Sequence, residues 1–167
     1  MLQLHTLISK AYSRLCDLVI FKHSRIFNVP LQFAYDWCTD FSSEDSKITG
    51  SKFPRILLEK TKKRVVYAGF KTGSDGKPKL AVRVVTLQPK TYSWHLDYFA
   101  EEDLEVGDYN LVRLGPEKTK FTVTLNNKWK HGKGPSKGEF ETSIKKTWDS
   151  FTPALERDYR RKSVHRR

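Results

Sequence analysis

The residues best suited to ligand contact lie in the segment 91–99, where large and polar side chains alternate. Every second position holds a large side chain: Tyr92, Trp94, Leu96 and Tyr98. On a strand, side chains two residues apart point to the same face, so this face would be rich in aromatic rings. Buried Tyr and Trp side chains need a polar partner, and a wet pocket for an apolar molecule supplies one. We expect these residues to form the floor of a cavity.

His95 and Asp97 lie between these positions and therefore point to the opposite face. They are two residues apart, so they could interact, as general acid–base chemistry would require. If the aromatic face lines the cavity, however, both lie on the outside of the sheet. The sequence therefore predicts no catalytic residue.

Arg83, Tyr109 and Arg113 are polar residues that strand alternation could place inside the cavity. An inward-facing arginine could bind a carboxylate or phosphate through two parallel hydrogen bonds. The alternative is that each is a surface side chain. Both alternating sets of the segment 80–87 are rich in apolar residues, so the sequence leaves open which set faces inward.

The sequence contains no recognisable motif for binding a metal or a cofactor. The five histidines are far apart, with no HxH, HExxH or Cys/His cluster, and no Walker or Rossmann glycine pattern follows a predicted strand. We therefore predict no metal and no cofactor. Two cysteines, Cys16 and Cys38, make no disulfide framework, which favours a reduced, cytoplasmic setting.

The chain is basic, with 31 Lys and Arg against 19 Asp and Glu, a net charge of +12. This charge suits an anionic partner such as RNA, the ribosome or an acidic protein. The alternative is the Lys-rich surface of a soluble protein, because the basic residues are spread along the chain. No stretch approaches 18 apolar residues, so we predict no transmembrane segment.

A long amphipathic helix over 136–162 is the element that must cover the cavity. Its apolar stripe follows helical spacing at Phe140, Ile144, Trp148, Phe151, Leu155 and Tyr159. Ser136 and Glu139 fit a capping box at its start. Pro153 lies inside the stripe, which predicts a kink or a break over 149–153. Trp148 and Phe151 would form the roof of the cavity.

The remaining segments predict a sheet that holds this helix. A strand over 21–29 is followed by a helix over 31–39, a short helix within 40–50, and antiparallel strands joined by turns. This order predicts an α+β fold with a curved antiparallel sheet of about seven strands around the long helix. We predict one domain over 21–162 and a basic tail over 163–167.

Residues 1–20 form a separate segment. Apolar residues recur at helical spacing at Leu4, Leu7, Ile8, Ala11, Tyr12, Leu15, Leu18 and Val19. Three interpretations remain open: an amphipathic helix packed on the domain, a poorly ordered leader, and a helix on a membrane surface.

Two segments carry a resemblance to a known family. The residues 25–41, RIFNVPLQFAYDWCTDF, give a strand, a Pro, and a helix with a central aromatic and an Asp near its end; KTWDSF at 146–151 lies in the closing helix. With the element order, they resemble the helix-grip fold of the START/Bet v-like superfamily, called SRPBCC, in its polyketide cyclase/dehydrase-like branch. The resemblance implies a cavity that in relatives holds lipids, sterols or polyketides.

These observations give three functional hypotheses. The first is a protein that binds a hydrophobic small molecule or lipid between the sheet and the closing helix. The second is a cyclase/dehydrase-like enzyme, and the third is a basic protein that binds RNA, the ribosome or an acidic protein. Under the first two, the expected ligand-binding residues are Tyr92, Trp94, Leu96, Tyr98, Arg83, Tyr109, Arg113, Trp148 and Phe151.

Overall fold

A computed structural model describes residues 19–42, 45–50, 53–73, 75–101, 103–129 and 135–164. The predictions for residues 1–18 and for the last residues of the tail, 165–167, lie outside these ranges.

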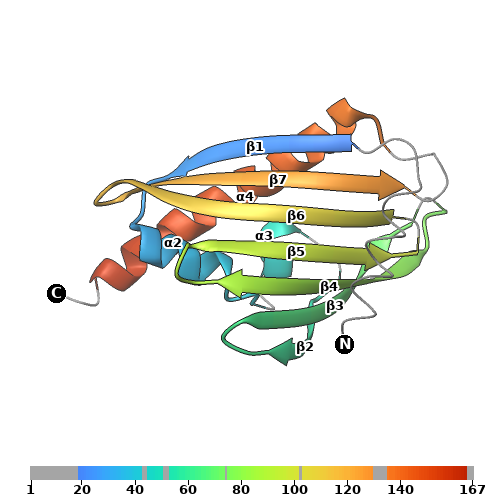
Figure 1. The fold of residues 1–167 in the computed structure, drawn as a ribbon, viewed down its shortest axis with the longest axis horizontal. Coiled ribbons are helices and arrows are strands. Elements are labelled where there is room, and N and C mark those ends of the chain that lie inside the picture. The colour runs from blue at the N-terminus through green and yellow to red at the C-terminus, as the bar shows by residue number, and fades with distance from the viewer. Residues whose placement is uncertain are drawn as a thin grey trace.

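The structure is built on one antiparallel sheet of seven strands in the order β1-β7-β6-β5-β4-β3-β2 (Figure 1). Strands that are consecutive in the chain from β2 to β7 are therefore also adjacent in the sheet, and β1 forms the far edge beside β7. The strands are β1 Val19–Phe27, β2 Ile56–Lys60, β3 Arg64–Thr72, β4 Pro78–Gln88, β5 Ser93–Ala100, β6 Asp103–Gly115 and β7 Lys118–Trp129. The predicted α+β fold with an antiparallel sheet of about seven strands is confirmed.

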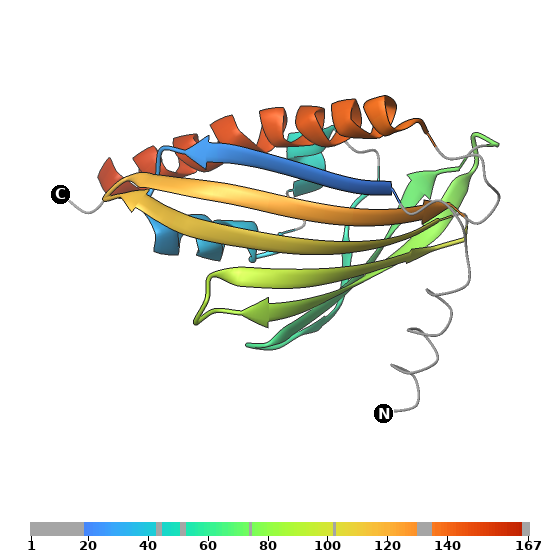
Figure 2. The ribbon, with the colours of Figure 1, turned by 45° about the horizontal axis from the view of Figure 1, so that its top comes forward.

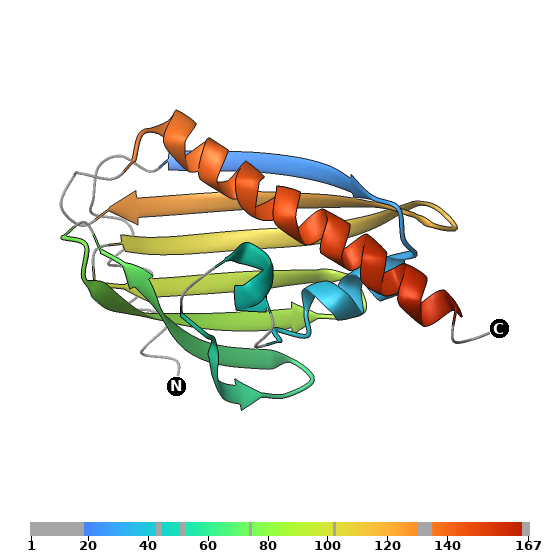
Figure 3. The same cartoon turned by 180° about the vertical axis from the view of Figure 1, so that it is seen from behind.

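Three helices lie on one face of the sheet: α2 Leu31–Cys38, α3 Asp45–Thr49 and α4 Lys137–Val164. Figure 2 shows this layering from the side, and Figure 3 shows α4 running obliquely across the strands. The helix α2 begins directly after Pro30, whose fixed φ suits that position. The helix α3 is followed by Gly50, whose φ of 67° favours glycine.

The predicted capping box at the start of α4 is present. The Ser136 hydroxyl lies 2.7 Å from Glu139 Oε2, which also accepts a hydrogen bond of 2.8 Å from the Ser136 backbone N–H, and the Glu139 N–H donates to the Ser136 hydroxyl at 3.3 Å. These bonds satisfy backbone donors that the first helical turn leaves without partners. The sequence alone therefore located the start of α4 to within one residue.

Of the kink or break predicted over 149–153, the break does not occur: α4 is helical without interruption from Lys137 to Val164. The side chains on either side of Pro153 explain why: Phe151 and Leu155 are buried, so tertiary packing holds both halves in place. The Trp148 carbonyl near this point accepts hydrogen bonds from Thr152 Oγ1 at 2.7 Å and from Arg25 Nη1 at 3.3 Å.

The face of β4 that points inward, which the sequence left open, is now decided. Ala81 and Val85 are 1% and 0% exposed, whereas Leu80 is 53% exposed. The set that contains Ala81, Arg83 and Val85 therefore faces the helices.

Polar contacts fasten α4 to the rest of the domain. Glu156 Oε1 accepts hydrogen bonds from the backbone N–H and from Nδ2 of Asn28, at 2.9 and 2.8 Å. Trp37 Nε1 in α2 donates to Asp158 Oδ2 at 3.1 Å, and Arg25 in β1 forms an ion pair with Asp149. These contacts fix the C-terminal half of α4 on the domain. The N-terminal half of α4 is thereby also held in place, as one wall of the space beneath it.

Among the described residues, no helix is both long enough and apolar enough to cross a membrane.

Candidate functional site

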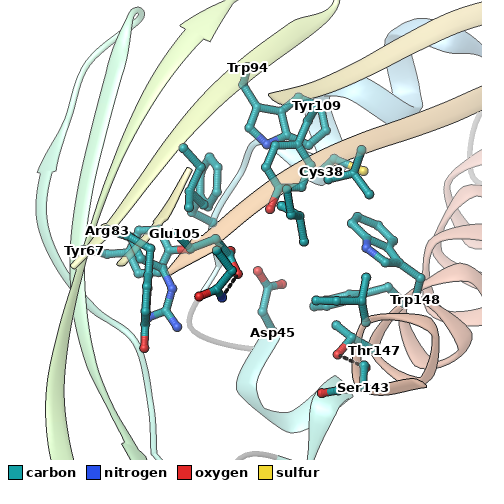
Figure 4. Close-up of a pocket in the computed structure, with 18 of the residues that line it drawn as sticks. Cys38, Asp45, Tyr67, Arg83, Trp94, Glu105, Tyr109, Ser143, Thr147 and Trp148 are labelled. Carbon is teal, nitrogen blue, oxygen red and sulfur yellow. Dashed lines mark hydrogen bonds between the residues drawn. The ribbon is translucent and has the colours of Figure 1, made fainter. Parts of the chain in front are cut away.

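A cavity of about 430 Å³ lies between the inner face of the sheet, the α2–α3 region and α4 (Figure 4). Arg83, Tyr67 and Glu105 come to it from the sheet, Asp45 from α3, and Trp148, Thr147 and Ser143 from α4 on the opposite side. The walls of the cavity therefore come from elements that are far apart in the sequence.

One part of the cavity is aromatic. The rings of Trp94 and Tyr109 are stacked, with centroids 5.0 Å apart and an interplanar angle of 9°. On the α4 side, Trp148 lies 5.5 Å from Phe151 between ring centroids. Apolar and aromatic walls of this kind are typical of sites for small apolar molecules.

Gly107 makes the position of the Tyr109 ring possible. A Cβ atom at Gly107 would lie 2.6 Å from Tyr109 Cε2 and 2.8 Å from Leu125 Cδ2, closer than such atoms approach. The Tyr109 side chain thus leans over a strand position that has no side chain, and its ring closes the floor of the cavity there.

The other part of the cavity is a polar row that the strand register creates. Tyr67 pairs with Arg83, Arg83 with Tyr98, Tyr98 with Glu105 and Glu105 with Asn127 across five adjacent strands. All five side chains line the cavity. Directly opposed residues on adjacent strands lie about 5 Å apart, so the row forms one continuous polar strip.

Arg83 lies between two tyrosine rings of this strip. Its Cζ is 4.6 Å from the ring centroid of Tyr98 and 5.5 Å from that of Tyr67, both within the range of cation–π attraction. Within the part of the chain that the structure describes, Arg83 forms no ion pair and no hydrogen bond. Its guanidinium N–H groups are therefore available to an acceptor in the cavity.

The other charged groups of the lining have partners. Arg55 forms an ion pair with Asp45, and Lys71 Nζ lies 2.5 Å from Asp103 Oδ1. Glu105 Oε2 accepts a hydrogen bond of 3.1 Å from Asn127 Nδ2. Arg83 therefore differs from the other charged groups that line the cavity within the described ranges.

Burial changes the protonation chemistry of the strip. Loss of solvation raises the pKa of Glu105, an effect that the charge of Arg83 partly offsets. Burial also raises the pKa of Tyr98, and nearby Asp103 acts in the same direction. The buried Asn127 Oδ1 lacks a hydrogen-bond partner among the described residues. The strip thus offers a cation, a carboxyl group and a free acceptor to a bound molecule.

No family model matches the sequence, and no curated protein matches it significantly. Solved structures do match the fold. The Zhui aromatase/cyclase from Streptomyces sp. R1128 aligns with a TM-score of 0.69 at 12% identity, over 88% of this chain and 96% of that chain.

A START superfamily protein from Mycobacterium smegmatis aligns with a TM-score of 0.63 at 12% identity, covering 85% of this chain and 97% of that one. Ara h 8.0201 also gives 0.63 at 12% identity, over 83% and 98%. This protein has the helix-grip fold of the START/Bet v-like superfamily. The resemblance inferred from the sequence is thereby confirmed for the fold.

The helix-grip cavity brings together most of the residues expected to bind a ligand. Those that line it are Arg83, Trp94, Leu96, Tyr98, Tyr109, Trp148 and Phe151. They come from three strands and from α4, as the predicted floor and roof require.

Tyr92 and Arg113 are not among the lining residues. Tyr92 precedes β5 with a φ of 51°, a left-handed conformation that takes it out of the strand alternation. Its hydroxyl donates to Gln32 Oε1 at 3.2 Å. Arg113 is exposed beside the register shift near the end of β6.

His95 and Asp97 lie on the outer face of the helix-grip sheet, as the alternation predicted. His95 Nδ1 lies 2.7 Å from Asp108 Oδ1, and its Nε2 lies 3.4 Å from Asp97 Oδ1. Asp97 and then Asp108 raise the pKa of His95 to about 9, although burial acts in the opposite direction.

Sequence reasoning missed several polar lining residues: Asp45, Arg55, Tyr67, Asp103, Glu105 and Asn127. Tyr67 lies two residues after Val65, on the same face of β3, and could have been found from the alternation of that strand. The others come from strand ends and from the segment around α3, where the sequence has no periodic signal. Among the described residues, no group of three or more His, Cys, Asp and Glu side chains could hold a metal ion.

Proposed function

We propose that this protein binds a hydrophobic small molecule or lipid that carries one anionic oxygen group, such as a carboxylate. The observation that supports it is the position of Arg83, a cation without an ion-pair partner among the described residues, in a cavity whose other part is lined by aromatic rings. The aromatic part would hold the apolar body of the ligand, and Arg83 would bind its anionic group.

The size and chemistry of the cavity support the apolar part of the proposal. A volume of about 430 Å³ lies within the range of ligand pockets, roughly 300–1,000 Å³. Trp94, Tyr109 and Trp148 supply flat apolar surface, and each square ångström removed from water contributes about 25 cal/mol. A molecule with fused rings or an acyl chain would therefore gain most of its affinity here.

The arrangement of Arg83 supports the anionic part. A guanidinium that lies against aromatic faces keeps its in-plane N–H donors for an acceptor, and two parallel N–H donors match a carboxylate. The tyrosines also reduce the number of side-chain conformations that Arg83 must lose on binding. A charge-assisted pair in this partly buried position is stronger than one in open water.

The first experiment tests occupancy of the cavity. Mass spectrometry of natively purified protein should show a bound apolar acid, and titration with anthracene-9-carboxylate should show saturable binding to the emptied protein. Thr147→Trp fills the cavity from α4 and should weaken binding about tenfold or more, the equivalent of ~1.4 kcal/mol. The matched control is Lys146→Trp, at an exposed neighbouring position, which should leave the affinity unchanged.

The second experiment tests the anionic group. Arg83→Leu should weaken binding of anthracene-9-carboxylate about 10- to 100-fold, since hydrogen bonds to charged groups contribute ~1.5–3 kcal/mol. Binding of the neutral analogue 9-anthracenemethanol should be nearly unaffected. Arg113→Leu is the control at an exposed arginine outside the cavity lining. If neither compound binds the wild-type protein and no ligand co-purifies, the proposal is wrong.

A cyclase/dehydrase-like enzyme is the second candidate, and the polar strip favours it. An Arg–Tyr pair lines the cavity, and Glu105 beside it has a raised pKa, as a general acid or base requires. The test is conversion of a poly-β-ketone model compound into a cyclised, dehydrated product. Glu105→Gln should then abolish turnover while leaving binding of anthracene-9-carboxylate intact. An anionic macromolecular partner for the basic surface stays a prediction, which salt-dependent heparin binding would test.

A further inference from the structure

The outer face of the sheet, opposite α4, carries an apolar band at one end. The register places Leu104, Phe99, Val82, Ala68 and Ile56 in one row across the adjacent strands β6 to β2. Further apolar side chains on the same face flank this row, with Asp97 between the last two: Val66, Phe70, Leu80, Val84 and Val106. We call these ten residues the outer band. Figure 1 looks onto this face, with α4 behind the sheet.

The outer band is unusual for a sheet of this kind. An antiparallel sheet covered on one side normally alternates apolar and polar residues, with the polar ones in water. Here Leu80 is 53%, Ile56 48% and Phe70 44% exposed. The apolar residues on both faces of β3 and β4 are typical of strands that are covered on both sides. Ala68 in the middle of the row is only 6% exposed, but the larger side chains around it leave apolar surface in water, and an exposed apolar patch marks a contact site.

The chain enters the sheet at the level of this band. β1 begins at Val19, and its second residue, Ile20, is 50% exposed on the outer face. Ile20 pairs with Asn126, which pairs with Val106, a residue of the outer band. The chain that precedes β1 therefore reaches the sheet at the level of the band, one strand (β7) away from its β6 edge.

The segment immediately before β1 has the complementary pattern. Its apolar residues recur at helical spacing between Leu4 and Leu18, whereas Lys10, Ser13 and Arg14 fall elsewhere on the helical wheel. Fifteen residues of helix extend about 22 Å. The strands are spaced about 4.8 Å apart, and β4 is the fourth strand from β1, ~19 Å away, so a helix that starts at β1 would cross β7 and reach β6, β5 and β4 of the outer band.

We propose that residues 3–18 form an amphipathic helix that packs its apolar stripe on the outer band of the same chain. The sheet would then lie between two helical layers, α4 on the inner face and this helix on the outer face. Continuity of the chain favours this occupant over a second copy or a membrane, because the segment is tethered next to the band at a high effective concentration.

Disulfide cross-linking in the full-length chain tests the proposal. In a background with Cys16→Ser and Cys38→Ala, Ile8→Cys is combined with Leu80→Cys in the outer band, or with Thr86→Cys. Both partner positions are exposed on the outer face of β4, six residues or about 20 Å apart. Under mild oxidation, the Leu80→Cys pair should form a bond within one chain at least tenfold faster than the Thr86→Cys pair.

A second pair of variants shows whether the apolar stripe is responsible. Leu15→Asp places a charge in the stripe and should reduce the fast cross-linking to the rate of the Thr86→Cys control. Ser13→Asp adds the same charge on the opposite side of the predicted helix and should leave the rate unchanged. Equal rates for the two cysteine pairs, or cross-links only between chains, would overturn the proposal. These outcomes do not depend on ligand binding in the cavity.

Discussion

Arg83 lies over the ring of Tyr98, with 4.6 Å between its Cζ and the ring centroid, because the two residues face each other across β4 and β5. The contact holds a cation at the inner face of the sheet, where a carboxylate on β6, Glu105, is only one strand further away. Three consequences follow: the tyrosine orients the arginine, the arginine stabilises the ionised form of the Glu105 carboxyl group, and burial of Glu105 opposes that ionisation and raises its pKa.

We expect the ring of Tyr98 to matter for anion binding through Arg83. If the proposed function is correct, Tyr98→Leu should weaken binding of anthracene-9-carboxylate about threefold to thirtyfold, the equivalent of ~0.5–2 kcal/mol of cation–π attraction. Tyr98→Phe keeps the ring and should bind almost as the wild type does. Isothermal titration calorimetry of the three proteins gives the comparison. Equal losses for the two variants would show that the hydroxyl group, and not the ring, is required.

Two glycine substitutions should change stability in opposite directions. Gly107→Ala forces a Cβ against Tyr109 and Leu125 and should lower the free energy of unfolding by about 1–3 kcal/mol. Gly138→Ala in the first turn of α4 meets no atom within 4 Å and should stabilise by a few tenths, up to ~1 kcal/mol, through helix propensity. Urea unfolding measures both. A neutral Gly107→Ala would mean that the Tyr109 ring can move without cost.

Stability should depend on pH through His95. Its folded-state pKa is about 9, above the ordinary value of 6.5, because Asp97 and Asp108 favour the charged imidazolium. The folded state therefore holds this proton more tightly. The stabilisation is fully present below pH 6.5 and is lost as the pH rises towards 9.

The measurement is the difference in urea midpoint between the wild type and His95→Gln at pH 6.5, 7.5 and 9. This difference should shrink as the pH rises, and an NMR titration of the imidazole should give the raised pKa directly. A difference that stays constant or grows towards pH 9 would contradict the expectation.

Replacing Pro153 should stabilise the protein. Pro153 is exposed inside α4, where it cannot donate a backbone hydrogen bond to the Asp149 carbonyl. Proline in a helix interior costs about 3 kcal/mol relative to alanine, so Pro153→Ala should raise the free energy of unfolding by ~1–3 kcal/mol. Thermal unfolding with Arg157→Ala, an exposed position one turn further on, as control checks this. A lower stability would show that Phe151 and Leu155 need the proline to reach their buried positions.

Much of the fold was available from the sequence because local patterns specify it. The capping box at Ser136, the helical spacing from Phe140 to Tyr159 and the alternation around Trp94 each depend on neighbours within four residues. They gave the order of the elements, the closing helix and the aromatic face of β5. The break allowed for at Pro153 was wrong, because a local rule for helix breaking was outweighed by the burial of Phe151 and Leu155.

Tertiary structure alone decided the polar half of the cavity. Tyr67, Arg83, Tyr98 and Glu105 are separated by 16, 15 and 7 positions in the chain, and only the strand register sets them side by side. Both sides of β4 are apolar, so the alternation within this one strand could not predict that Arg83 faces inward. The sequence determined which elements form and which faces are apolar, because those depend on near neighbours. The structure determined which charges meet and which lack a partner, because that depends on contacts between distant segments.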